Sequence, residues 1–376
     1  MSSFNRAAAL ALASLAFLAR PAAADAGPRF RDGESQAMGR TGVASSRDAG
    51  SLFLNPAALG RSTGFGAGMM ADVGLNGVLL DYADWAKDNY QWLSNLDSLT
   101  KRIGPVDNKW APFSNAAMLY GNWGGTAVAF LMDTRYELTV AKAVVTPVLG
   151  VGALSDLVIT AGRGFTIPEG DFRLGMAFKY LYRLRYDSRL VGTGDDDFYQ
   201  AKHTLERKSS GLFGTLAKIQ AAGDLAETQE GFGFDLGIEK DITDAWTAGV
   251  SLLNFPTVLD GRFTRPDPML GAAWHPSIDW LPDLDDHLVI NLDWQHVLSP
   301  ATPWYKQLKA GVAFEGRVRG RPVSYIAAGL NDGYPTFGFR AGYFVYLSYV
   351  YVAEEIGTYP GQQKLSFHKL MLQAEY

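Results

Sequence analysis

The chain has 376 residues, a formal net charge of −5 at pH 7 and no cysteine. The acidic balance argues against a nucleic-acid partner, because proteins that bind nucleic acid neutralise phosphates with Lys and Arg. The lack of cysteine excludes a disulfide framework and thiolate metal or redox sites. The mean hydropathy of −0.04 resembles that of a soluble protein, but β-strands cross a membrane without producing a hydropathy peak.

Residues 1–26 are predicted to be a secretory signal peptide. A short apolar run, residues 7–19, follows Arg6 and precedes Ala24-Asp25-Ala26, an A-x-A cleavage pattern. A retained anchor helix is the alternative, although this run is too short to span a bilayer comfortably. We expect the mature chain to begin at Gly27.

Residues 27–63 differ in composition from the rest of the mature chain, and their centre is residues 36–60. This stretch is small, polar and interrupted by glycine, with one short apolar run, so it is neither a membrane strand nor an independent core. We expect it to fold as a hatch, a compact plug inside something larger. The prediction rests on backbone-permissive glycines, a carboxylate that can accept from backbone amides and a turn motif: Gly39, Gly42, Asp48, Asn55, Pro56 and Ala57. The alternative is an ordinary surface turn that leads into the first strand.

Alternation of apolar and polar residues with period two is the strongest signal in the rest of the chain. In residues 171–187 the apolar face carries residues of even number, from Phe172 through Met176 to Tyr186. The opposite face is basic and carries Arg173, Lys179, Arg183 and Arg185. A run of this length is unusual for a sandwich. We therefore predict a membrane-spanning strand with its apolar face toward lipid and its basic face toward a wet lumen.

The same alternation recurs along the chain. Clear strands are predicted at residues 64–79, 232–239, 246–252, 287–295 and 307–315, and weaker ones at 115–122, 126–138, 156–165, 269–275, 322–330, 336–342, 345–354 and 364–376. Together they give about 14 strands, an even number as in single-chain bacterial barrels. An open sheet edge in lipid would leave backbone groups unpaired. The predicted fold is therefore all-β: a transmembrane antiparallel β-barrel of residues 64–376 with the hatch in its lumen. A secreted β-sandwich or solenoid would share this composition.

Two long connections, residues 81–112 and 188–230, fall on the same side of the predicted barrel. Long loops mark the extracellular side of such barrels. Both loops contain apolar residues that could capture a hydrophobic ligand: Trp85, Trp92 and Leu96 in the first, and Leu212, Phe213 and Leu216 in the second. Residues 276–286 form a connection on the opposite side that is longer than expected. An unrecognised strand within this connection would change the strand count.

The last predicted strand ends on Tyr376, and an aromatic terminus of this kind resembles the signal by which the barrel-insertion machinery recognises its substrates. In the hatch, the order G-R-x-G-V-A followed by D-A-x-x-x-x-x-N-P-A-x-L resembles the long-chain fatty-acid transporter family of outer-membrane barrels, the FadL, TodX and PorV-like proteins. GFGFDLGIEKD, AWTAGVSLLNF, INLDWQHV and the run that begins GLNDGYPTFGF extend the resemblance. The two long loops match nothing in that family.

The resemblance implies an integral protein of the Gram-negative outer membrane that takes up hydrophobic small molecules passively, such as long-chain fatty acids or aromatic hydrocarbons. Its implied partners are this ligand, the lipid and lipopolysaccharide of the outer membrane, and the insertion machinery. No cofactor is implied. The loops would capture the ligand and the hatch would act as the gate. PorV-like relatives imply an alternative, an outer-membrane scaffold that binds protein partners in secretion.

Three other features bear on possible chemistry. The chain has five histidines and no HExxH or P-loop pattern, so we predict neither an enzyme nor a metal site. The acidic run Asp195, Asp196 and Asp197 could bind a hard cation such as Ca²⁺ or form a solvated loop tip. The basic lumen face could attract a carboxylate head group or pair with lumen acids such as Asp235, Glu239 and Asp293.

Overall fold

The structure is a computed structural model of the whole chain. It describes residues 32–89, 104–107, 109–142, 147–192, 226–276, 288–299, 302–318, 321–356, 361–362 and 364–376. The predicted signal peptide therefore lies outside the described residues.

Fourteen antiparallel strands form the wall of a barrel in the described part of the chain. They are β1 (Phe65–Asn76), β2 (Lys109–Trp123), β3 (Thr126–Lys142), β4 (Pro147–Ile167), β5 (Phe172–Gly192), β6 (Ala226–Thr243), β7 (Trp246–Leu253), β10 (Asp267–Trp274), β11 (Leu288–Trp294), β12 (Leu308–Val318), β13 (Arg321–Asn331), β14 (Tyr334–Gly342), β15 (Val345–Glu355) and β16 (Lys364–Glu375). Two short segments, β8 (Thr257–Leu259) and β9 (Arg262–Phe263), form a hairpin that pairs with β6 and was not predicted.

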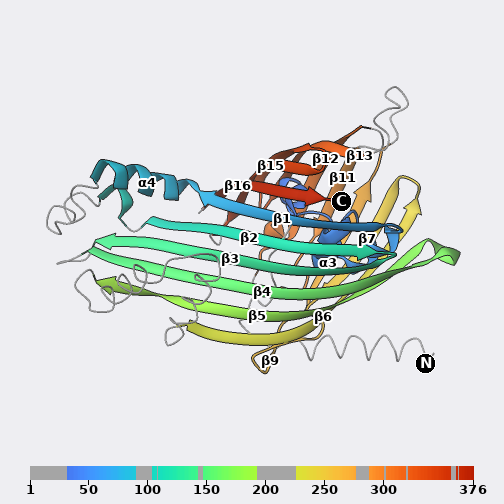
Figure 1. The fold of residues 1–376 in the computed structure, drawn as a ribbon, viewed down its shortest axis with the longest axis horizontal. Helices are drawn as coiled ribbons and strands as arrows, with labels where there is room; N and C mark the ends of the chain where they lie inside the picture. The colour runs from blue at the N-terminus through green and yellow to red at the C-terminus, as the bar shows by residue number, and fades with distance from the viewer. Residues whose placement is uncertain are drawn as a thin grey trace.

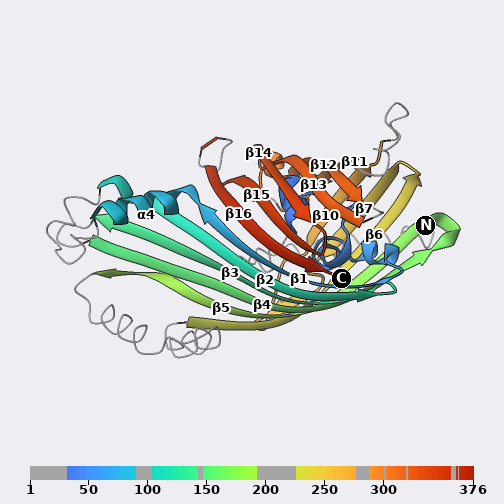
Figure 2. The same cartoon turned by 45° about the horizontal axis from the view of Figure 1, so that its top comes forward.

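The sheet is closed, as predicted (Figures 1 and 2). The first and last strands pair antiparallel, with Gly68 opposite Glu375 and Asn76 opposite Phe367. At the end of the chain, the amide of Tyr376 donates to the carbonyl of Ala67 at 2.9 Å. On the other side, β5 pairs with β6 from Phe172 to Tyr186. Closure gives every wall strand two neighbours, which is the condition for β-structure in lipid.

The two faces of the wall have the chemistry that the alternation predicted. On β5 the side chain of Met176 is 49% exposed, whereas its neighbour Ala177 is 1% exposed. Phe172, Leu174 and Phe178 point outward with Met176, while Arg173, Lys179 and Arg183 are buried inside. The outer face is therefore apolar and the inner face carries the charges, the arrangement of a barrel that spans a membrane.

Strand lengths differ greatly around the barrel. β4 and β5 each have 21 residues, whereas β11 has 7 and β7 has 8. The long strands β2 to β5 project beyond the rest of the wall as an extended sheet (Figure 1). The predicted loops are shortened accordingly: β2 begins at Lys109, β5 continues to Gly192 and β6 begins at Ala226. The reason is that pairing with a neighbouring strand continues past the lipid-facing alternation on which the prediction relied.

The helix α4 (Gly77–Asn89) begins where β1 ends and contacts β2. Its Tyr82 is buried against Ala111, and the Tyr82 hydroxyl donates to the carbonyl of Lys109 at 2.7 Å. Lys109 also pairs with Asp81 of the helix at 2.9 Å. The helix thereby covers the part of β2 that extends beyond the end of β1. Without the helix, this part of β2 would be an exposed sheet edge. No helix in the described residues is long and apolar enough to cross a membrane.

The Met176→Arg variant should lose about 2–4 kcal/mol of stability, because an arginine near the midplane of the lipid face must leave water. Urea unfolding of the barrel in lipid vesicles measures this cost. Glu169→Arg, in the exposed turn Pro168–Gly170 between β4 and β5, is the matched control and should change the unfolding free energy little. Equal effects of the two substitutions would contradict a lipid-facing Met176.

Candidate functional site: the lumen and its inner segment

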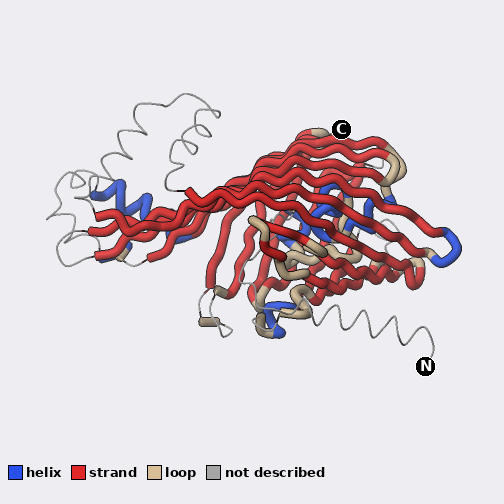
Figure 3. Tube along the Cα trace, turned by 90° about the horizontal axis from the view of Figure 1, so that it is seen from below, coloured by secondary structure: helices blue, strands red, loops and turns tan. Residues whose placement is uncertain are grey.

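Residues 33–62, here called the inner segment, lie inside the barrel. They contain α2 (Gly33–Ala37), the 3-10 turn η1 (Asp48–Gly50), α3 (Ser51–Leu54) and the 3-10 helix η2 (Pro56–Arg61). Figure 3 shows these short helices enclosed by the strands. The segment contacts both sides of the wall, since η2 packs on β4, β5 and β6 while α2 packs on β13, β14 and β15.

A buried carboxylate on the wall holds the middle of the inner segment. The Oδ2 atom of Asp293 accepts from the amides of Gly42 at 2.8 Å and Val43 at 3.1 Å. Two residues further along, the Gln295 side chain donates to the carbonyl of Arg40 at 2.7 Å. Hydrogen bonds to an ionised acceptor are roughly twice as strong as neutral ones. Asp293 is therefore an anchor of the inner segment, a role that sequence reasoning did not give it.

Asn55, Pro56 and Ala57 form the second anchor. Asn55 is fully buried, and its side-chain amide donates to the carbonyl of Val43 at 2.7 Å. Its side-chain oxygen accepts from the amide of Ala57 at 3.1 Å and so caps η2, with Pro56 at the first position of that helix. Proline is favoured there because its fixed φ suits the helix and it has no amide to satisfy. The turn chemistry read from the sequence thus holds two parts of the inner segment together.

Asn55→Ala should destabilise the docked inner segment by about 1–3 kcal/mol, because the buried carbonyl of Val43 loses its donor and η2 loses its cap. The barrel should still fold, since its strand ladder does not use Asn55. We expect the variant to run as a heat-modifiable band with increased permeability to small antibiotics. Asn89→Ala, in α4 outside the lumen, is the control. Permeability equal to wild type in a folded Asn55→Ala barrel would contradict this anchor.

Glycines of the wall allow the inner segment to approach the strands closely. A Cβ atom at Gly175 would overlap the backbone of Pro56 and Ala57, and one at Gly237 would overlap the side chain of Asn55. In the segment itself, Gly39 has φ +74° and lies against the carbonyl of Leu330. Only glycine combines this backbone conformation with this approach at no steric cost. The glycines on the inner face are therefore a docking surface.

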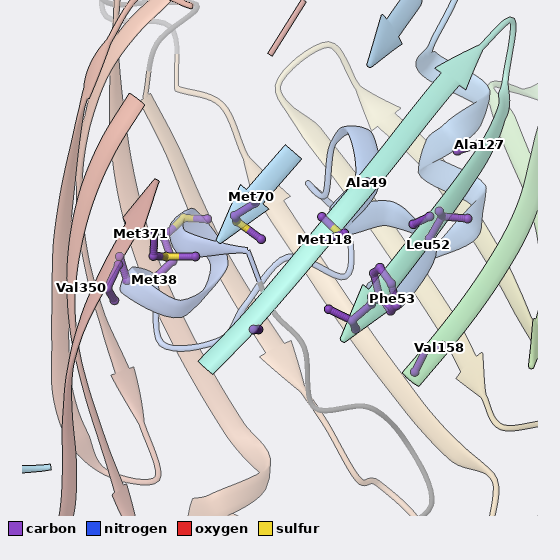
Figure 4. Close-up of a cluster of buried hydrophobic side chains, with 14 of the residues drawn as sticks. Met38, Ala49, Leu52, Phe53, Met70, Met118, Ala127, Val158, Val350 and Met371 are labelled. Carbon is purple, nitrogen blue, oxygen red and sulfur yellow. The ribbon is translucent and has the colours of Figure 1, made fainter. Parts of the chain in front are cut away.

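Apolar side chains complete the docking (Figure 4). Leu52 and Phe53 of α3 and Met38, just after α2, point toward the wall and are almost fully buried. The wall supplies methionines and small apolar residues to the same cluster: Met70, Met118, Met371, Ala127, Val158 and Val350. Methionine fills irregular gaps and tolerates rearrangement. The inner segment is thus fixed by polar anchors together with an adaptable apolar contact.

The predicted basic face is neutralised by carboxylates of neighbouring strands. Lys179 pairs with Asp235 at 2.7 Å, and Arg183 makes a two-pronged contact with Asp156 at 2.6 and 2.8 Å. The exposed Arg185 lies further along β5 toward the end where β5 and β6 are connected. Pairing with lumen acids, one of the two interpretations offered by the sequence, is therefore what the structure shows for Lys179 and Arg183.

Arg173 belongs to a four-residue cluster that includes the inner segment. It donates to Glu239 at 3.0 Å and binds Asp241 through two hydrogen bonds of 2.5 and 2.6 Å. Arg61, at the end of η2, contacts the same Glu239 at 2.8 Å. Because both guanidinium groups share one buried carboxylate, the inner segment and the wall are coupled electrostatically at this point.

Other residues singled out in the sequence lie in several parts of the molecule. Trp85 packs on the Tyr82 cluster of α4, which places it on the wall and not in the lumen. Tyr376 is exposed beside Ala67 at the seam between β1 and β16. Asp48 lies in η1 inside the barrel. The remaining predicted capture and cation-binding residues lie outside the described residues: Trp92, Leu96, Leu212, Phe213, Leu216, Asp195, Asp196 and Asp197. No cluster of His, Cys, Asp and Glu side chains suited to a metal ion occurs within the described ranges.

Among the described residues, cavities border the inner segment at both ends of the barrel. The turn-side cavity, of about 280 Å³, is lined by charged groups such as Glu34, Arg47 and Arg340. This cavity lies at the end of the barrel where β16 and the C-terminal Tyr376 end. The loop-side cavity, of about 170 Å³, lies at the opposite end, between Arg40 of the inner segment and strands β1, β2, β3, β15 and β16. Its lining mixes apolar side chains, including Phe367, with charged ones. The loop-side cavity therefore lies at the end of the barrel from which the long connections leave.

Comparison with solved structures shows the fold to be that of hydrocarbon channels. The Pseudomonas putida toluene transporter TodX is similar over 92% of this chain and 97% of its own, with 14% identity and a TM-score of 0.52. The Ralstonia pickettii toluene transporter TbuX gives 92%, 97%, 12% and 0.51 for the same quantities. No family model matches this sequence, and no curated protein does. The fold is the one that the family resemblance of the hatch motif implied.

Proposed function

We propose that this protein is an outer-membrane channel for passive uptake of small hydrophobic molecules, and that the inner segment is its hatch. The carrying observation is a closed, lipid-facing barrel whose lumen is filled by a segment held through identifiable contacts. The likeness to toluene transporters over more than nine-tenths of both chains supports the same class of solute. Lipopolysaccharide blocks apolar solutes, so a protein is needed to carry them across that layer.

The size of the loop-side cavity narrows the range of solutes that the protein can bind. A cavity of about 150 Å³ accommodates a benzene-sized ligand. At about 170 Å³, the loop-side cavity suits a single aromatic ring better than the whole chain of a fatty acid. We therefore favour monoaromatic compounds over long-chain fatty acids. The secretion scaffold suggested by PorV-like relatives gains no support from the solved neighbours.

The test is uptake of radiolabelled toluene by Gram-negative cells that produce this protein, compared with cells that carry the empty vector. We expect faster uptake without any energy source, at equal amounts of heat-modifiable barrel in the outer membrane. Uptake equal to the vector strain, with the barrel folded, would refute the channel. A stable protein partner recovered with the barrel would favour the scaffold.

A further inference from the structure

We infer that the loop-side cavity is a binding site for small neutral phenols, with the hydroxyl group held between Asp72 and Lys369. This inference rests on the proposed function and names the solute class for it. Both residues line the cavity, and they come from the paired strands β1 and β16.

The first observation is a buried carboxylate oxygen that lacks a hydrogen-bond donor. The side chain of Asp72 is 4% exposed, and its Oδ1 atom has no hydrogen-bond partner among the described residues. A buried acceptor without a partner costs free energy, so such an atom in a cavity is expected to bind a donor. Water or the polar group of a solute can supply that donor.

The second observation is the position of Lys369. Its ammonium nitrogen lies 4.0 Å from Oδ1 of Asp72, too far for a hydrogen bond. Gly74 helps to set this position, because a Cβ atom there would come within 3.2 Å of the Lys369 side chain. An oxygen atom about 2.6 Å from the carboxylate and about 2.8 Å from the ammonium would satisfy both groups. The Lys369 side chain, which is 18% exposed, moves aside to admit it. Such an oxygen donates its proton to Asp72 and accepts from Lys369.

The opposite charges select the type of polar group. A carboxylate would be attracted by Lys369 but repelled by Asp72, and a protonated amine would meet the reverse. Of the other charged groups in the lining, Asp133 pairs with Arg135 at 3.2 Å and Arg40 pairs with Glu354 at 2.9 Å. Glu137 lines the cavity as well and adds negative charge, so it further disfavours an anionic solute. A hydroxyl group is neutral and both donates and accepts. It is therefore the group that satisfies both residues at once.

The remaining lining fits the ring of the solute. Phe367, Trp110, Val352 and Leu365 line the same cavity, and Ala116, opposite Asp72 on β2, leaves space beside the carboxylate. Aromatic and aliphatic walls bind a ring through its apolar area. A ring without a hydroxyl would displace water from Asp72 without replacing its hydrogen bond, which loses affinity. The site should therefore prefer a phenol to a toluene of the same size.

The experiment uses the full-length barrel in detergent and follows fluorine NMR signals of 4-fluorophenol and 4-fluorotoluene. We expect the wild-type protein to bind 4-fluorophenol at least about tenfold more tightly than 4-fluorotoluene, because a hydrogen bond to a charged group contributes a difference of this size. Asp72→Asn and Lys369→Met should each reduce that preference and leave 4-fluorotoluene binding unchanged. Ala116→Phe should weaken both ligands by filling the space, whereas Ala117→Phe, on the lipid face of the same strand, should weaken neither.

Competition on the wild-type protein tests the inference without a variant. Phenol should displace 4-fluorophenol at least about tenfold better than anisole, which accepts a hydrogen bond but cannot donate one to Asp72. Benzoate and benzylammonium should compete poorly. Equal competition by phenol and anisole, stronger competition by benzoate, or no saturable binding of any ring compound would overturn the inference.

The outcomes separate this inference from the proposed function. Protein-dependent uptake of toluene in cells, with no preference for 4-fluorophenol over 4-fluorotoluene, leaves the channel intact and refutes the hydroxyl site. Preferential binding of 4-fluorophenol that both Asp72→Asn and Lys369→Met reduce, with no protein-dependent uptake of toluene, supports the site and refutes the toluene channel.

Discussion

Replacing Gly175 by valine should expel the inner segment from its place against β5. A Cβ atom at this position would overlap the backbone of Pro56 and Ala57, and backbone atoms cannot move aside as the end of a side chain can. Overpacking of this kind costs about 1–3 kcal/mol or more, and here it acts directly on the docked turn. We expect the barrel to insert and the influx of small hydrophilic antibiotics to rise more than in Asn55→Ala.

The matched control for this prediction is Gly121→Val on β2. A Cβ atom there lies 3.9 Å from its nearest neighbour, the carbonyl of Gly66, so valine fits without strain. Deletion of residues 33–63 should raise influx in wild type but add little in the Gly175→Val background, because the same segment is already displaced. Wild-type influx through a folded Gly175→Val barrel would show that the inner segment does not limit permeation.

Lys179→Met should destabilise the barrel by about 3–5 kcal/mol, the cost of leaving a buried charge without its partner. Both members of the pair are more than nine-tenths buried, and Asp235 also accepts from the amide of Asn254 at 2.6 Å. The carboxylate that loses its lysine therefore still holds the connection between β7 and β8 through Asn254. Urea unfolding followed by tryptophan fluorescence measures the loss.

A second variant separates the charge from the shape of this pair. Lys179→Met with Asp235→Asn removes both charges and keeps an oxygen that can accept from Asn254. We expect it to recover a large part of the stability lost in the single variant, as removal of both partners usually does. If the double variant were as unstable as the single one, packing of the lysine stem and not its charge would be the main contribution.

The alternation of side chains was sufficient to predict the barrel because it reports a local property. Met176 and Ala177 are neighbours in sequence, and their opposite environments follow from the pleat of one strand. Strand ends were less predictable. β5 continues to Gly192 because β4 pairs with it there, and a pairing partner that is distant in sequence leaves no periodic signal in β5 itself.

The lumen was predictable only in part. Asn55 and Pro56 could be recognised because turn chemistry is written in adjacent residues. Asp293 could not be assigned to the amides of Gly42 and Val43, which are 251 and 250 residues away along the chain. The alternation identified Asp293 as a lumen carboxylate. The residues next to it in sequence, however, do not show whether it pairs with a lysine or accepts from backbone amides. Gly175 likewise has an ordinary place in the alternation, and only the fold shows what it approaches.

From the seam between β1 and β16 we expect an order of assembly. The inner segment continues directly into β1, and the strand that pairs with β1 at the seam is β16, which is synthesised after the other wall strands described here. Once these two strands are zipped together, the segment can reach its wall contacts only through the mouths of a finished cylinder. If the segment docks before β1 pairs with β16, this passage is avoided, because the wall strands can then assemble around the segment. In this protein the filling of the lumen would be a step of biogenesis, completed before the cylinder exists.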